Sequence, residues 1–454
     1  MTPTVAQALP STKRRLGGGF LAGAGGRLLP ASVPFRWFGT AIVCHALAWI
    51  ALAAGAAQWP GWRGGPGWPL AALHLVTLGT LVASAIGASL QLLPVATRQP
   101  VHWPRLAALL WWLFVPGLAA LVLGMGLVRP AWMTAGAALL LVVLGTWTAL
   151  LALNLRGAKG MPGVVLHGWG AVVSLLLLIA SAAALVAWWN GSAWAQAISR
   201  EALRALHASA GVFGVMGLLV LGLSTILLPM FALASVPDER VQLRTGAAAV
   251  AALVLAVAAA FAPGDSAAAL GARALALAAA SLALAWHVRA MRQLLASGMR
   301  GDLGRCTRQL QLGWGAAALA LLCAALALAR TGSGHDEPWG ALFVLAAVGG
   351  WLLSVLFGVL QRILPFLASM HAARGGRRRP PTPSALSADG ALRVHEWAHP
   401  AALVLLAAAI TTHSSAWLLA AAACGFVGAL GWLAFFGVLM QRLRRAAAPS
   451  VGTA

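Results

Sequence analysis

The side chains best suited to chemistry in this chain are its 11 histidines, because a neutral imidazole can bind a transition-metal ion. The other candidates are few. The chain has no tyrosine, and its nine acidic residues all lie outside the long apolar runs, so a buried relay of carboxylates is not expected. The four cysteines form neither a CxxC nor a CxxCH motif, which argues against a zinc cluster and against covalent attachment of a c-type haem. Histidine is therefore the residue type on which a functional hypothesis depends.

The elements that must position these histidines are membrane helices. Of the 454 residues, 61% are hydrophobic and 9% are charged, and the mean hydropathy is +0.86. A water-soluble fold cannot bury that much apolar surface, so a soluble enzyme is excluded and the lipid bilayer is the expected surrounding. The net charge of +22 comes from basic residues placed between apolar runs. We interpret it as a determinant of topology and expect no nucleic-acid partner.

Twelve apolar stretches are long enough to span a bilayer, which takes about 20 helical residues. The eleventh is the weakest, because polar residues from Thr411 to Ser415 interrupt it. We expect a membrane domain over residues 36–445, a disordered cytoplasmic N-terminal tail over 1–35 that lacks a signal-peptide core, and a cytoplasmic C-terminal tail over 446–454. The expected spans are 37–59, 69–95, 105–127, 131–154, 163–188, 205–233, 244–262, 266–288, 310–329, 339–370, 399–415 and 416–441.

The basic residues predict the orientation of these spans. With the N-terminus in the cytoplasm and twelve alternating helices, the inner segments hold 25 Lys and Arg residues and the outer loops hold six. Because Lys and Arg resist translocation, this asymmetry indicates that both termini are cytoplasmic. We expect a multi-pass protein of the bacterial inner membrane.

An internal repeat is the most informative pattern in the sequence. Spans two, six and ten each carry a glycine seven residues before a proline, and the proline follows Leu-Leu or Ile-Leu. The prolines are Pro94, Pro229 and Pro365, which are 135 and 136 residues apart with four spans from each to the next. This pattern indicates that the chain consists of three successive units of four helices.

This plan resembles subunit I of the haem–copper oxidase superfamily, in which twelve helices form three arcs around a pseudo-threefold axis. The motifs that carry the resemblance begin with Leu73-His74-Leu75 in span two and Leu206-His207-Ala208 in span six, and both spans end in Leu-Leu-Pro. The resemblance covers roughly residues 36–445. It implies an all-α fold of twelve transmembrane helices in three pseudo-threefold arcs of four.

The chain departs from the family at most of its metal ligands. It lacks the paired histidines of helix seven, the two histidines of helix ten, the tyrosine of the oxygen-reducing members and the buried glutamates of the nitric-oxide reductases. A competent oxygen-reducing oxidase is therefore not expected. What remains resembles a divergent branch that is similar in outline to the NnrS-type proteins of nitric-oxide response.

The resemblance selects His74 and His207 as the candidate metal ligands. In this family the second helix supplies an axial histidine to haem and the sixth supplies a copper ligand, so haem b at His74 is implied and copper is the second metal that it allows. His413, in the outer half of span eleven, is the third candidate for cofactor binding, and His45 near the middle of span one is a weaker one. The other seven are expected at span ends or in loops, namely His102, His167, His287, His335, His371, His395 and His399.

Small residues near these positions leave two interpretations open. Gly79 and Gly87 in span two and Gly211, Gly214 and Gly217 in span six follow a small-xxx-small rhythm. That rhythm is typical of close helix contact, and it would also permit a flat cofactor.

The sequence thus predicts a haem- or metal-binding membrane protein that acts in nitric-oxide or redox stress, with a redox protein or another metalloprotein as its partner. The alternative is a cofactor-free membrane carrier or an assembly partner of a metalloenzyme.

Overall fold

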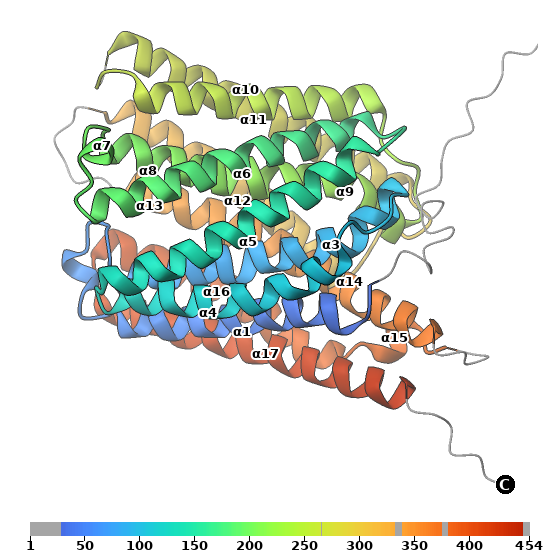
Figure 1. Ribbon diagram of the computed structural model, residues 1–454. Coiled ribbons are helices and arrows are strands. Elements are labelled where there is room, and N and C mark those ends of the chain that lie inside the picture. Colours follow the sequence, from blue (N-terminus) through green and yellow to red (C-terminus); the bar gives the residue numbers. More distant parts are fainter. Residues whose placement is uncertain (1–28, 265, 332–337, 375–379, 448–454) are drawn as a thin grey trace, which may run out of the picture.

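The computed structural model describes residues 29–264, 266–331, 338–374 and 380–447. Within these ranges twelve helices are long and apolar enough to cross a membrane, so each expected span is confirmed and the protein has an all-α membrane fold. Figure 1 shows them as one bundle of roughly parallel rods. Most of the expected N-terminal tail, the end of the C-terminal tail, His335 and Arg377–Arg379 lie outside the described residues.

The first unit of four spans begins near the N-terminus. Its second span is a single long helix in three parts, and a short turn of 3₁₀ helix precedes it. The elements are α1 (Ser32–Ala54), η3 (Trp59–Gly61), α2 (Trp68–His74), η4 (Leu75–Val82), α3 (Ala83–Thr97), α4 (Pro104–Gly126) and α5 (Pro130–Arg156).

The second unit repeats this order with a short helix in place of the 3₁₀ turn. Its elements are α6 (Pro162–Trp189), α7 (Ala193–Gln196), α8 (Arg200–Ala208), η5 (Ser209–Gly217), α9 (Leu218–Ala232), α10 (Glu239–Phe261) and α11 (Ala267–Ser297).

The third unit differs in one insertion, a short helix between its second and third spans. Its elements are α12 (Arg305–Ala329), α13 (Trp339–Val344), η6 (Leu345–Leu352), α14 (Leu353–Arg374), α15 (Pro383–Leu386), α16 (Asp389–Thr412) and α17 (Ser415–Ala447). α16 starts ten residues before the expected eleventh span, because the polar turns at its start are helical as well.

The three units have the same internal packing. In each, the first helix packs along all three parts of the second span, and the third and fourth helices pair as an antiparallel hairpin: α4 with α5, α10 with α11, and α16 with α17. Neighbouring units meet through α5 and α6, through α11 and α12, and through α17 and α1. The last contact closes the bundle into a ring, as expected for three equivalent units.

A π-helical segment interrupts the second span of every unit at the same place. These segments are η4, η5 and η6, which begin at Leu75, Ser209 and Leu345, 134 and 136 residues apart. The repeat of the prolines is thus accompanied by a repeat of backbone geometry that the sequence pattern did not reveal. The π segments also meet one another, η4 with η5 and η5 with η6, so the second spans approach each other inside the ring. Wide helical turns of this kind are frequent at functional sites.

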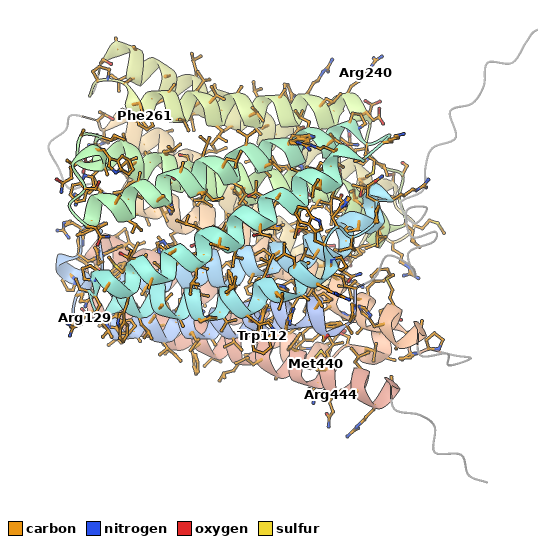
Figure 2. The ribbon with its side chains drawn as sticks, in the orientation of Figure 1. Trp112, Arg129, Arg240, Phe261, Met440 and Arg444 are labelled. Atoms are coloured by element: carbon orange, nitrogen blue, oxygen red, sulfur yellow. The ribbon has the colours of Figure 1, made fainter. Side chains whose placement is uncertain are left out.

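The two ends of the bundle differ. The start of α1, the end of α17 and the helix α15 lie at one end, and α7 lies at the other (Figure 1). Figure 2 shows Arg240 and Arg444 at the first end and Arg129 at the second. Between the ends, large apolar side chains such as Trp112 remain exposed, which suits a surface that faces lipid.

Candidate functional site

The two histidines that the repeat singled out face each other. The ring centres of His74 and His207 are 6.3 Å apart, and the ring planes are inclined by 28°. His74 ends α2 directly before η4, and His207 lies two residues before η5, so each lies just before the π segment of its unit. Each lies about 10 Å along its helix from the start of the span.

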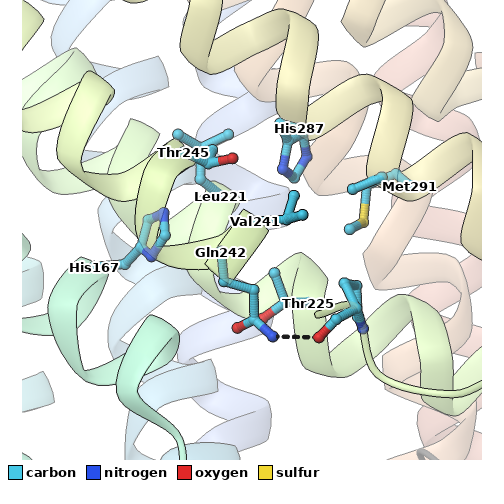
Figure 3. A pocket seen from close by; sticks show the side chains of 10 residues that line it. His167, Leu221, Thr225, Val241, Gln242, Thr245, His287 and Met291 are labelled. Atoms are coloured by element: carbon cyan, nitrogen blue, oxygen red, sulfur yellow. Dashed lines mark hydrogen bonds between the residues drawn. The ribbon is translucent and has the colours of Figure 1, made fainter. Parts of the chain in front are cut away.

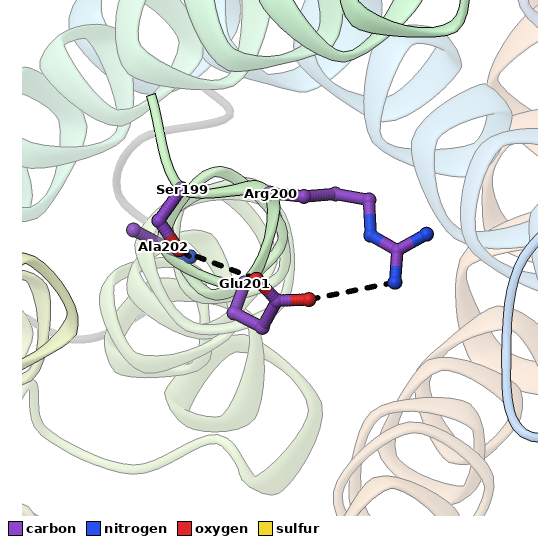
Figure 4. A network of polar contacts seen from close by, with 4 residues as sticks. All are labelled: Ser199, Arg200, Glu201 and Ala202. Atoms are coloured by element: carbon purple, nitrogen blue, oxygen red, sulfur yellow. Dashed lines mark hydrogen bonds and ion pairs between the residues drawn. The ribbon is translucent and has the colours of Figure 1, made fainter. Parts of the chain in front are cut away.

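Contacts at the start of α8 hold in place the helix that carries His207. Ser199 caps the helix, because its Oγ accepts a hydrogen bond from the backbone N–H of Ala202 at 3.3 Å (Figure 4). Glu201 lies in the first turn, where a negative charge is favourable, and it forms an ion pair with Arg200 at 3.4 Å. The guanidinium of Arg200 also lies 5.2 Å from the ring centre of Trp188 at the end of α6. These contacts hold the first turn of α8 against α6, two turns before His207.

The ring nitrogens of the pair have few partners. His74 Nδ1 lies 3.0 Å from the carbonyl oxygen of Leu70, one turn earlier on the same helix. If that nitrogen carries the proton, it donates to Leu70 and leaves a lone pair on Nε2. This is how a metal-bound histidine is commonly oriented. His207 Nδ1 is buried without a hydrogen-bond partner, although both side chains are only half-buried overall. The pair is therefore free to bind a further group.

In the described part of the third unit, no histidine lies at this place. The corresponding residues before η6 are Phe343 and Val344. The ring of Phe343 lies 5.6 Å from that of Phe213 in η5, and Phe213 lies 6.3 Å from Trp351 in η6. The second and third units thus meet through aromatic rings, whereas the first and second meet through imidazoles.

His413 is not part of this arrangement. It is exposed, it follows the last residue of α16, and its backbone is left-handed with φ of 52°. Among the described residues, the ring contact of His74 is with His207. The structure places the third candidate at an exposed helix end.

The glycines of the second spans serve helix packing. A Cβ at Gly79 would lie 2.6 Å from the Cβ of Cys44 in α1, and one at Gly87 would lie 2.8 Å from that of Trp37. In the second unit, Gly214 packs in the same way against Ser174 of α6. Of the two interpretations of the small-residue rhythm, close helix contact is confirmed at these positions.

Four histidines expected at the membrane surface or in loops are buried, and that expectation is wrong. They are His167, His287, His395 and His399, with exposed fractions of 2%, 5%, 3% and 1%. The expectation failed because polar neighbours such as Glu396 made the start of α16 resemble a loop. Glu396 instead forms an ion pair with Arg308 of α12, which lets the helix continue.

One sequence signal could have found two of them. His395 and His399 are four residues apart with Glu396 after the first, and this His-Glu-x-x-His spacing puts two imidazoles on one face of a helix. The structure adds His45 of α1 to the same place, with its ring centre 5.8 Å from that of His395. No local pattern marks His45 as their neighbour.

His167 and His287 line a separate small pocket (Figure 3). It encloses about 240 Å³ of empty space, part of it open to solvent, and Gln242, Thr225 and Met291 also line it. His167 Nδ1 lies 2.7 Å from the carbonyl oxygen of Gly163, and its Nε2 is buried without a partner. Figure 3 shows His167 and His287 on neighbouring walls of this pocket.

Comparison with known proteins adds no assignment to this geometry. No family model and no curated protein sequence matches this chain. The site must be interpreted from its own residues.

Proposed function

We propose that this chain is a haem-binding protein of the bacterial inner membrane, with the fold of haem–copper oxidase subunit I and a role in nitric-oxide or redox stress. The observation that carries the proposal is the pair of imidazoles, His74 and His207, that two equivalent helices bring together. Oxygen reduction is not proposed, because the chain lacks the tyrosine and the further histidines that the resemblance would require.

The separation of the rings would let both histidines hold one metal ion. The ring centres of His74 and His207 are 6.3 Å apart, and the rings are stacked. Each ring would have to turn about its side-chain bonds to direct a nitrogen at the same ion, which imidazole binds at about 2.0–2.1 Å.

The small number of protein ligands favours haem over a bare ion at this pair. Among the described residues there is no group of three or more His, Cys, Asp or Glu side chains that could hold a metal ion. Haem b needs only two axial ligands from the protein, and it would supply one-electron redox chemistry and binding of small diatomic ligands. A copper ion on His207 would require additional donors.

The residues of the chain then have defined tasks. His74 and His207 would hold the iron, and the carbonyl of Leu70 would keep the Nε2 lone pair of His74 directed outward from its own helix. α8, which carries His207, lies toward the end of the bundle opposite to the start of α1 and the end of α17 (Figure 1), and we propose that this end is the outer face. A redox protein or another metalloprotein would exchange electrons with the site from that side.

A second candidate function is a cofactor-free carrier or an assembly partner of a metalloenzyme. The packing of the glycines favours it, because Gly79, Gly87 and Gly214 lie against side chains of α1 and α6 and so serve helix contact, which needs no cofactor.

The difference spectrum of the purified protein, reduced minus oxidised, tests the proposal. We expect a Soret band and about one haem per chain in the parent. His74→Ala and His207→Ala should each lower the haem content severalfold, because each removes one of two ligands of the same iron. His413→Ala is the matched control and should keep the parental content, since His413 is exposed and follows the last residue of α16.

A colourless parent protein would overturn the proposal and favour the cofactor-free alternative. A normal haem content in His207→Ala, together with loss in His74→Ala, would contradict the shared ion.

A further inference from the structure

Four exposed basic side chains lie at one end of the first unit, in or beside the two loops that follow α3 and α5. They are Arg98, Arg105, Arg156 and Lys159. The chain leaves this end along α1 and returns to it along α2, η4 and α3, so both loops lie at the same end of the bundle as the start of α1. The basic asymmetry of the sequence predicts that this end is cytoplasmic.

Gln99 joins the two loops. Its Nε2 donates a hydrogen bond to the carbonyl oxygen of Gly157 at 2.7 Å. A Cβ at Gly157 would lie 2.3 Å from Gln99 Oε1, so the loops can approach this closely because residue 157 is a glycine. Arg98 directly precedes Gln99 and Arg156 directly precedes Gly157. The contact therefore brings the charges of both loops together, and we call the four basic residues the basic patch.

The positive charge of the basic patch has no partner of its own. The first acidic residue in the sequence is Glu201, which pairs with Arg200 on α8 at the other end of the bundle. Within the described part of the chain, none of the four side chains forms an ion pair. In the second unit, by contrast, the corresponding loop contains Asp238 and Glu239 directly before Arg240. The first unit thus presents an uncompensated charge to an external anion.

Arg98 has a left-handed backbone, with φ of 58°, directly after α3. The second unit repeats this turn at Leu233, which follows α9 with φ of 51°. Each of the two residues lies four positions after the proline of its second span. The turn therefore belongs to the repeated fold and accepts leucine, whereas the positive charge at this place is particular to the first unit.

A cavity adjoins the basic patch, between α3, α5 and the loop that carries His102. It encloses about 300 Å³ of empty space, part of it open to solvent, and its walls are mostly apolar. Asn154 lines it and is 4% exposed. The Oδ1 of Asn154 accepts a hydrogen bond from Thr97 Oγ1 at 2.8 Å, but its Nδ2 is buried without a partner. Because an unpaired buried polar atom costs about 1–3 kcal/mol, we expect a bound group to offer an acceptor there.

The polar and apolar parts of this region are arranged by depth. Asn154 lies two residues before the end of α5, close to the basic patch. About two turns deeper, Trp147 Nε1 already donates to Ser89 Oγ at 2.8 Å, so that part of the cavity needs no further partner. On the outer surface, α4 continues from the same loop with a stripe of exposed leucines at helical spacing, namely Leu106, Leu109 and Leu113. A positive rim above apolar surface suits a ligand with an anionic head and an apolar tail.

We propose that the basic patch and the mouth of this cavity bind the headgroup of an anionic phospholipid from the cytoplasmic leaflet. The lipid phosphate would accept a hydrogen bond from Asn154 Nδ2, while Arg98 and Arg156 supply the opposite charge. A phosphatidylglycerol headgroup is favoured over phosphatidylethanolamine, because the ammonium group of the latter would add a positive charge to the patch. The site lies at the end of the first unit away from His74, so it does not depend on the proposed haem.

Binding of radiolabelled phosphatidylglycerol to the purified full chain in detergent tests this site. We expect a dissociation constant at least tenfold lower than that of phosphatidylethanolamine with the same acyl chains. Arg98→Leu and Arg156→Gln should each weaken binding of phosphatidylglycerol about fivefold, which corresponds to about 1 kcal/mol for each basic side chain. Asn154→Leu should weaken it severalfold, because the free amide donor is lost. A monodisperse elution profile establishes that each variant is folded.

Two controls separate this site from charge in general and from free phosphate. Arg240→Gln removes one exposed positive charge at the same end of the bundle (Figure 2) and should keep the parental affinity. An excess of glycerol phosphate should leave the lipid bound, because it lacks the acyl chains. Equal affinity for the two lipids, displacement by glycerol phosphate, parental affinity in Arg98→Leu, Arg156→Gln or Asn154→Leu, or an equal loss in Arg240→Gln would each overturn the proposal.

Discussion

At the scale of single residues, the burial and the neighbours of each histidine depend on the packing of distant helices more than on its local sequence. His74 and His207 could be predicted, because each lies near the start of the second span of its unit. His413 was also predicted in the outer half of its span, but it lies exposed after the last residue of α16. His395 and His399 carry a usable spacing, whereas His45 joins them only through the contact between α1 and the third unit. A partner on a distant helix leaves no local trace in the sequence.

The hydrogen bond between Ser354 and His399 provides a test at this scale. Ser354→Ala removes the hydroxyl that lies 3.0 Å from His399 Nε2, and both residues are buried. Leaving the imidazole nitrogen buried without its partner costs about 1–3 kcal/mol. We therefore expect a free energy of unfolding lower by that amount, measured by thermal unfolding in detergent, and an unchanged Tm would contradict this hydrogen bond.

At the scale of elements, the second span of each unit combines a π segment with glycines at close contacts. The sequence indicated the glycines and the prolines, but it did not indicate the π segments, because the wider turn leaves the apolar composition unchanged. The lengths of the helices were predictable wherever apolar runs set them. α16 was the exception, since an ion pair between Glu396 and Arg308 stabilises a polar first part that hydropathy alone excludes.

Two glycines of α5 make a matched pair for testing helix packing. A Cβ at Gly136 would overlap the backbone nitrogen of Leu121 in α4 and lie 2.6 Å from the carbonyl oxygen of Gly117. A Cβ at Gly145 meets nothing within 4 Å. Gly136→Ala should force α4 and α5 apart and lower the free energy of unfolding by about 1–3 kcal/mol.

Gly145→Ala should instead be neutral or stabilising, because alanine is favoured over glycine inside a helix by about 1 kcal/mol. Thermal unfolding of the two variants in the same detergent measures the difference. A lower Tm for Gly145→Ala than for Gly136→Ala would contradict the packing of this hairpin.

At the scale of the whole molecule, composition and the spacing of three prolines were enough to predict twelve spans in three units. The closure of the ring through α17 and α1 could not be predicted in this way, because it joins the first and last helices across the whole chain. The sequence repeat also gave no distances between helices. The 6.3 Å separation of His74 and His207 therefore emerges only from the assembled bundle.

The repeat makes a geometric prediction. An experimental structure should superpose the unit of α1–α5 on α6–α11 and on α12–α17 by successive rotations of about 120° around the membrane normal, as expected for parallel repeats. The residues Pro94, Pro229 and Pro365 should coincide in that superposition. A twofold relation between two halves of six helices would contradict both the repeat and the family resemblance.

The orientation in the membrane is open to a labelling experiment, because the native cysteines are poorly accessible. Cys44, Cys306 and Cys323 are buried and Cys424 is half-buried, so an impermeant maleimide should give little background. Ser384 in α15 and Gln196 in α7 are exposed and lie on elements at opposite ends of the bundle (Figure 1). With 25 basic residues on the side of the termini and six on the other, we expect Gln196→Cys to react in intact cells. Ser384→Cys should react only after the membrane is opened. The reverse pattern would place His74 and His207 near the cytoplasm, and a partner for the proposed haem would then have to approach from inside the cell.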